Sequence, residues 1–149
     1  MKKSKSFAKK LIGRIEYVSF PEWDMSDIEA KIDTGAYTSS LHCHHVETYS
    51  EDGVKMVKFF LLDPDHPEYE KIPQQTQVKN IRNVKSSNGQ VEQRIAIKTV
   101  MEIAGKSYKI ELTLANRSKM KYPVLLGRRF LQNRFLVDVS GKFLNNNSK

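Results

Sequence analysis

The sequence predicts an all-β protein, a closed barrel of short strands with one short helix near the C-terminal end. The first observation is that several segments alternate apolar and polar residues or are rich in β-forming residues, as strands do. The second is that short turn signals separate these segments at regular intervals. Many short strands joined by regular turns favour a closed or sandwiched barrel.

Three segments carry the strand pattern most clearly: residues 54–62, 91–103 and 108–114. The turn signals between strands are Glu-Asp-Gly at 51–53, Ser-Asn-Gly at 87–89 and Ala-Gly-Lys at 104–106. Each is typical of a hairpin tip, and Asn-Gly is the strongest such signal. The sequence therefore predicts at least three β-hairpins.

The remaining segments are less regular. Residues 63–73 contain three prolines, which predicts an irregular connection. Residues 127–135 have a short helical pattern, with Phe130 and Leu131 facing inward. This is the single helix that we expect.

Length and composition bound the domain organisation. With 149 residues, 39% of them hydrophobic, the chain is long enough to bury one core without disulfides. We expect a basic flexible tail over residues 1–10, one domain over 11–144 and a disordered tail over 145–149. The single cysteine, Cys43, fits a reducing compartment. Because no apolar run is long enough to span a bilayer or to act as a secretory signal, we expect a cytoplasmic protein with no membrane partner.

The net charge of +8 indicates attraction to acidic partners. Five of the lysines, however, lie in the first ten residues. We find no RNA-binding aromatic signature, zinc finger or helix-turn-helix pattern. Nucleic acid is therefore not the partner that we expect.

One stretch, IEAKIDTGAYTSSLHCHH at residues 28–45, stands out. Asp33, Thr34, Gly35 and Ala36 follow an expected strand directly. Asp, Thr and Gly all suit turns, so a purely structural turn is one interpretation. Catalysis by the carboxylate is the other. A second pattern, YPVLLGRRFL, lies late in the chain at residues 122–131.

Together these two patterns resemble the retropepsin-like aspartic proteases, which carry an Asp-Thr-Gly-Ala loop early and an apolar-apolar-Gly-Arg segment late. The resemblance extends in consistent order over residues 12–138. Segments such as IGRIEYVSFPEW and VKSSNGQVEQR resemble a small bacterial branch, often labelled ATP-dependent zinc proteases. Some members of that branch are associated with ATP-grasp glutamate ligases that modify a ribosomal protein.

The resemblance implies a catalytic role for Asp33. Hydrolysis by this route needs two carboxylates that share one proton, one activating a water and the other donating to the substrate carbonyl. Because the chain has a single Asp-Thr-Gly, the resemblance implies a homodimer with one Asp33 from each protomer. It also implies that Thr34 bonds its counterpart and that Ala36 lies against the substrate path. Leu125, Leu126 and Gly127 would support the loop from behind.

The chain departs from the retroviral pattern after the loop. Retroviral members place acidic residues there, one of which pairs with the arginine matching Arg128, whereas this chain has Tyr-Thr-Ser-Ser. The partner of Arg128 is therefore open. Because residues 63–73 resemble an insertion, the dimer interface is open as well.

Residues 84–93 occupy the place of the flap that closes over substrate in the family. The expected flap residues are Ser86, Ser87, Asn88 and Gly89. The alternative is an ordinary Asn-Gly hairpin on the surface.

A histidine cluster at residues 42–45 raises the question of a metal. On a regular strand, His42 and His44 share one face, while Cys43 and His45 share the other. A zinc site usually needs three or four ligands, so structural histidines are the favoured interpretation and no cofactor is expected. AGKSY at 104–108 ends like a P-loop, but Val100 stands where its first glycine belongs, which excludes that motif.

Two functions follow from these patterns. The first is a dimeric aspartic endopeptidase that cleaves a peptide or protein; the second is a non-catalytic binding module of the same fold for an acidic or ribosome-associated partner. A zinc-dependent peptidase is a third, weaker option. Basic residues around the site, Arg82, Lys85, Arg94, Arg128 and Arg129, would suit acidic peptides such as polyglutamate.

Overall fold

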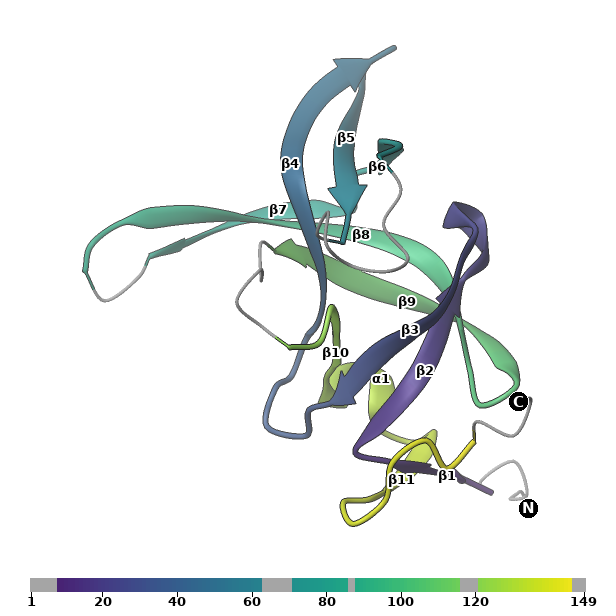
Figure 1. The fold of residues 1–149 in the computed structure, drawn as a ribbon. Helices are drawn as coiled ribbons and strands as arrows, with labels where there is room; N and C mark the ends of the chain where they lie inside the picture. Colours follow the sequence, from purple (N-terminus) through teal and green to yellow (C-terminus); the bar gives the residue numbers. More distant parts are fainter. Residues whose placement is uncertain (1–7, 63–70, 86–87, 116–120, 146–149) are drawn as a thin grey trace, which may run out of the picture.

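The computed structural model describes residues 8–62, 71–85, 88–115 and 121–145, and within them most of the chain is β-strand (Figure 1). The strands are β1 (Lys10–Gly13), β2 (Ile15–Phe20), β3 (Met25–Ile32), β4 (Ser39–Glu51), β5 (Val54–Leu61), β6 (Gln74–Gln77), β7 (Asn80–Lys85), β8 (Val91–Ile103), β9 (Lys106–Ala115), β10 (Val124–Leu126) and β11 (Phe135–Asp138). A 3-10 turn, η2 (Pro21–Trp23), and a short helix, α1 (Arg128–Leu131), complete the elements. None of the described helices is long and apolar enough to cross a membrane.

Six strands close into a barrel in the order β10, β3, β2, β8, β9 and β4, with β4 pairing back onto β10. Closure satisfies the hydrogen-bonding groups that the edge strands of an open sheet would leave exposed. The predicted fold class, an all-β closed barrel with one short helix, is confirmed.

The predicted hairpins at 51–53 and 104–106 form with two-residue turns. Asp52 and Gly53 have φ of 52° and 80°, and Ala104 and Gly105 have φ of 54° and 77°. Two consecutive positive φ angles define the turn whose twist matches that of paired strands. The predicted strand at 91–103 is β8 with the same bounds, whereas β9 is longer than predicted at both ends.

Strand β10 joins the late part of the chain to the early part. It runs parallel to β3, with Leu126 opposite Ile32, and antiparallel to β4, with Leu125 opposite Ser40. All three of its residues are buried. A strand buried on both faces needs a continuous apolar run, which Val124, Leu125 and Leu126 supply.

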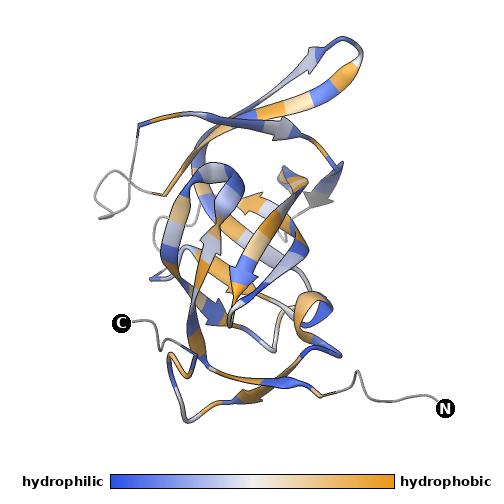
Figure 2. Ribbon diagram, turned by 90° about the vertical axis from the view of Figure 1, so that its right-hand side faces the viewer, coloured by the Kyte–Doolittle hydropathy of each residue, from blue (hydrophilic) through white to orange (hydrophobic). Residues whose placement is uncertain are grey.

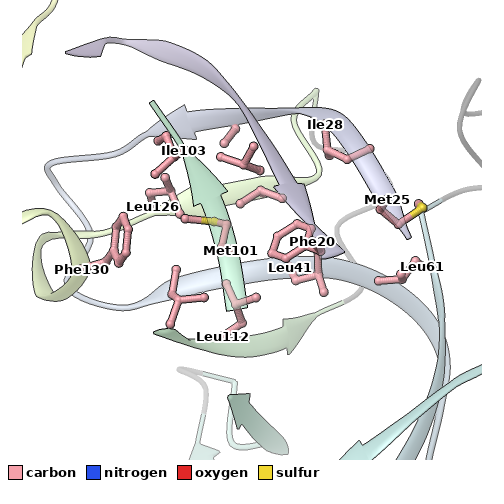
Figure 3. Close-up of a cluster of buried hydrophobic side chains, with 14 of the residues drawn as sticks. Phe20, Met25, Ile28, Leu41, Leu61, Met101, Ile103, Leu112, Leu126 and Phe130 are labelled. Atoms are coloured by element: carbon pink, nitrogen blue, oxygen red, sulfur yellow. The ribbon is translucent and has the colours of Figure 1, made fainter. Parts of the chain in front are cut away.

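The core fills the barrel (Figure 3). Side chains from all six barrel strands enter it, and Phe20, Ile28, Leu41, Met101, Leu112 and Leu126 are each at most 1% exposed. Figure 2 shows the matching alternation of hydrophobic and hydrophilic residues along the strands. Burial of this apolar surface is the main favourable term in folding.

A second, two-stranded sheet joins the ends of the chain. Strands β1 and β11 run parallel, with Leu11 opposite Leu136. The buried carboxylate of Glu16 accepts hydrogen bonds from the backbone N–H groups of Gly13 at 2.7 Å and Leu144 at 3.0 Å. It therefore ties the C-terminal segment to the start of β2. Of the predicted tails, Lys10 lies in β1 and the Asn145 side chain donates to the carbonyl of Leu11 at 2.8 Å.

The structure shortens the expected helix and adds a strand that the sequence pattern missed. The helix predicted over 127–135 spans only Arg128–Leu131, because Gln132 is extended and Asn133 has φ of 68°. Strand β6, Gln74–Gln77, was not predicted, because its polar residues show no apolar alternation. Most of the predicted irregular connection, residues 63–70, lies outside the described residues.

Candidate active site

Asp33 begins the loop between β3 and β4, and three hydrogen bonds hold it, two to its backbone and one to its side chain. Its N–H donates to the carbonyl of Leu126 at 2.8 Å, and its own carbonyl accepts from the N–H of Ala36 at 3.2 Å. The side-chain Oδ1 accepts from the N–H of Gly35 at 3.1 Å. One carboxylate oxygen is thus held by a backbone N–H, and the residue as a whole is half-buried.

Gly127 lets the start of α1 press against this loop. A Cβ at Gly127 would lie 2.5 Å from the carbonyl oxygen of Thr38 and 2.7 Å from that of Tyr37. Its φ of −99° is open to any residue, so the requirement for glycine is one of space. The Gly127 N–H donates to the Oγ of buried Ser39 at 2.9 Å.

Arg128 and Arg129 bind the loop with their backbones. The Arg128 N–H donates to the carbonyl of Ala36 at 2.8 Å, and the Arg129 N–H donates to that of Tyr37 at 2.9 Å. The Arg128 side chain donates to the carbonyl of Thr34 at 3.1 Å and lies 5.7 Å from the centre of the Tyr37 ring. The partners of the Arg128 side chain in this chain are therefore a backbone carbonyl and the face of an aromatic ring, in place of the acidic residue of the retroviral members.

The structure therefore brings most of the predicted site residues together. Asp33, Thr34, Gly35 and Ala36 form the loop, while Leu125, Leu126, Gly127 and Arg128 form its support. Sequence reasoning missed Ser39, whose hydroxyl accepts from Gly127. The sequence feature that could have identified Ser39 is a hydroxyl residue at the first position of the strand after the loop. It also missed Glu111, which pairs with Arg129 at 3.7 Å.

The predicted flap is a hairpin of β7 and β8 that projects beyond the barrel (Figure 1). Lys85 lies opposite Val91, and at the tip the Asn88 side chain accepts from the N–H of Gln90 at 3.1 Å. Gly89 has φ of 88°, as a tight turn requires. Ser86 and Ser87 lie outside the described residues. Closure over a substrate stays a prediction.

The histidine cluster does not follow the expected alternation. His45 has φ of 54°, and the register of β4 with β5 shifts between His44 and Glu47. A β-bulge of this kind re-aims the side chains around it. His42 is 3% exposed and Cys43 is fully buried, so β4 is covered on both faces there.

These histidines do not fit a zinc site. The ring of His44 stacks on Phe60 with 5.6 Å between centroids, while His42 is buried in the barrel wall. Within the described ranges, no group of three or more His, Cys, Asp or Glu side chains is placed to hold a metal. Burial also raises the pKa of the Cys43 thiol to about 12, which opposes the thiolate form that binds metals. We therefore derive no metal-dependent step.

The retropepsin-like class is defined by a closed six-stranded barrel with one Asp-Thr-Gly loop. A late apolar-Gly-Arg segment supports this loop. The profile of the RimB-like family, described as "Retropepsin-like aspartic endopeptidase RimB", matches residues 11–148, and the chain belongs to this family.

Curated relatives are similar over most of this chain. The "Probable alpha-L-glutamate ligase" of Shewanella halifaxensis is 37% identical over 89% of this chain, and that of Desulfotalea psychrophila is 37% identical over 91%. The chain spans 29% of the length of each. Among solved structures, Lpg0085 of Legionella pneumophila, described as of unknown function, matches with a TM-score of 0.73 at 22% identity. That match covers 93% of this chain and 99% of Lpg0085, and it supports the fold.

Proposed function

We propose that this protein is an aspartic endopeptidase that works as a two-fold homodimer with one Asp33 from each protomer. The observation that supports this most directly is the setting of Asp33. Its backbone is fixed by Leu126 and Ala36, and one carboxylate oxygen is held by Gly35. A structural turn also makes the bond between the Asp33 carboxylate and Gly35. The additional support of Asp33 from Leu126 on β10 is what catalysis, which needs a rigid carboxylate, would require.

In the proposed dimer, the two Asp33 carboxyl groups lie next to each other and share one proton, because two adjacent carboxyl groups cannot both be ionised. The ionised carboxylate takes a proton from a water held between them. The water oxygen forms a bond to the scissile carbonyl carbon, and the protonated carboxyl donates its proton to the carbonyl oxygen. Collapse of the resulting tetrahedral diol breaks the C–N bond: one diol hydroxyl returns its proton to the ionised carboxylate, the other carboxyl protonates the leaving amine, and the dyad regains its single shared proton.

The surface beside the loop supports the proposed dimer. Tyr37 is 51% exposed on the loop, and Leu11 and Leu136 are 50% and 55% exposed on the β1–β11 sheet. Figure 1 shows both the loop and this sheet in the lower half of the molecule. A two-stranded sheet with an exposed apolar pair is marginal alone, and a second copy that covers it would stabilise it.

The first test is cleavage of an unbiased peptide pool by the wild type and by Asp33→Asn, from mildly acidic to neutral pH. We expect cleavage that disappears in Asp33→Asn, with both proteins equally folded by circular dichroism. A chelator added to the wild type should change nothing. Cleavage that survives Asp33→Asn would refute the aspartic mechanism, and loss with the chelator would indicate a metallopeptidase.

A mixing experiment tests the dimer separately. If protomers exchange at random, an equal amount of Asp33→Asn added to the wild type leaves about half of the original activity, because mixed dimers lack one aspartate. A monomeric enzyme would keep all of its activity.

We further propose that the substrate is acidic, which the name of the glutamate-ligase relatives supports. On the flap hairpin, Arg82 lies directly opposite Arg94, and Glu92 bonds Arg94 at 3.2 Å. Like charges opposite each other destabilise a hairpin. An acidic ligand bound between the flap hairpin and the Asp33 loop would reduce the repulsion between Arg82 and Arg94. Arg82→Gln should lower kcat/KM for acidic peptides far more than for neutral ones, whereas Lys55→Gln, on β5 outside the flap hairpin, should lower neither. Equal losses for both peptide classes would exclude the idea.

The second candidate function is a binding module without catalysis. Its support is that the same domain occupies 29% of longer proteins named as probable ligases, where a recognition role would serve the rest of the chain. In that case wild type and Asp33→Asn bind an acidic peptide equally, and neither cleaves it.

A further inference from the structure

A basic cavity lies on the outer wall of the barrel, behind the Asp33 loop. Its volume is about 210 Å³, and it lies between β4, β8, β9, α1 and the residues that follow α1. The cavity shares Thr38 and Ser39 with the loop region, but it does not include Asp33. It is therefore a separate surface from the proposed catalytic one.

The charges around this cavity are strongly unbalanced. Four cationic side chains line it, from Lys98, Lys109, Arg129 and Arg134, against the single carboxylate of Glu111. Glu111 bonds Arg129 at 3.7 Å and lies directly opposite Lys98 across β8 and β9. One carboxylate cannot neutralise four cations, so the lining carries a net positive charge.

The cavity floor adds hydroxyl groups. Ser39 is 4% exposed and Thr113 is 9% exposed, and both line the cavity. The Ser39 Oγ accepts the N–H of Gly127, and its hydroxyl can in addition donate its own proton. Hydroxyl donors surrounded by Lys and Arg are the groups that bind tetrahedral oxyanions.

We propose that this cavity binds a compact, multiply charged oxyanion of about the size of phosphate, and that the bound anion braces the Asp33 loop. The bracing follows from two contacts. The Arg129 N–H donates to the carbonyl of Tyr37, and Ser39 holds Gly127. An anion that fixes the Arg129 side chain and the Ser39 hydroxyl therefore acts on both supports of the loop. The site does not depend on the proposed proteolysis, because its occupancy is measured by binding alone.

The test is an NMR titration of the full chain with inorganic phosphate at constant ionic strength. We expect saturable shifts centred on Thr38, Ser39, Thr113 and Arg129. Arg129→Gln should weaken binding by about tenfold, because it removes a charge-assisted donor. Glu111→Gln should strengthen binding several-fold, because it removes the competing carboxylate. The matched control, Lys55→Gln, should leave the affinity within about twofold.

Two results would overturn the proposal. One is the absence of saturable shifts at this cavity. The other is equal weakening by Arg129→Gln and Lys55→Gln, which would indicate general attraction to the basic surface. Short oligoglutamate in place of phosphate identifies the source of the anion. If it competes with phosphate, the cavity takes substrate carboxylates, and if it does not, the cavity takes a free tetrahedral anion.

Discussion

Gly127→Ala tests the contact between α1 and the Asp33 loop. The new Cβ would lie 2.5 Å from the carbonyl oxygen of Thr38, whereas ordinary contacts begin at 3.4 Å. The loop or the helix must therefore move by about 1 Å. The neighbours that it meets are backbone atoms held in place, so no flexible side chain can give way.

The magnitude follows from the bonds that this movement lengthens. The two backbone bonds from Arg128 and Arg129 measure 2.8 and 2.9 Å, so a shift of this size breaks them. Each contributes about 1 kcal/mol, and the loss of the buried bond to Ser39 costs about 1–3 kcal/mol more. We expect the free energy of unfolding to fall by about 3–5 kcal/mol, a large part of the total for a domain.

The assay is urea unfolding followed by the fluorescence of Trp23, the single tryptophan, which is 7% exposed. All variants are compared at one protein concentration, since the stability of a dimer depends on it. The expected loss moves the midpoint down by roughly 2 M urea. Gly105→Ala is the matched control, because its Cβ meets nothing within 4 Å and only the φ of 77° is strained. It should cost about 1 kcal/mol. If Gly127→Ala costs no more than this control, α1 does not support the loop as described.

Three further predictions concern other parts of the chain. Glu16→Ala should lower the free energy of unfolding by about 3 kcal/mol, because it removes a buried carboxylate with several backbone donors; a urea midpoint within error of the wild type would contradict this. Since the pKa of Cys43 is raised to about 12, iodoacetamide at pH 8 should label the folded protein far more slowly than the protein in urea, and equal rates would contradict its burial. Hydrogen bonds from Ser140 lower the pKa of Asp138 below 3.8, so this carboxylate stabilises the fold above that pH and the contribution disappears as pH falls through the lowered pKa. Asp138→Asn should therefore destabilise the protein at pH 6, and by less as the pH falls through the lowered pKa of Asp138; a difference that does not change with pH would refute the assignment.

Local chemistry explains which parts of the fold were predictable. The turns at Asp52-Gly53 and Ala104-Gly105 need residues that tolerate positive φ, and that need is visible in the sequence. The alternation in residues 91–103 reflects one buried face, which also leaves a visible pattern. By contrast, the parallel pairing of β1 with β11 depends on residues at opposite ends of the chain and leaves no local pattern.

The candidate site was predictable in its residues but less so in its contacts. Asp33 and Gly127 were identified because the motifs around them are specific. The role of Ser39 depends on its Oγ lying 2.9 Å from the N–H of Gly127, 88 residues away. The expected alternation of the histidines between the two faces of the strand was wrong, because the positive φ of His45 forms a bulge that redirects the side chains around it.

The insertion of β10 between β3 and β4 has a consequence for the timing of synthesis. Thr34 and the arginine that binds it are 94 residues apart. While the chain is being translated, Asp33 emerges long before the strand that completes its support, and contacts of such long range form late in folding. Under the proposed function, a nascent chain carries its carboxylate without a competent site. Under that proposal, the order in which the strands are made delays proteolysis until β10 has been synthesised.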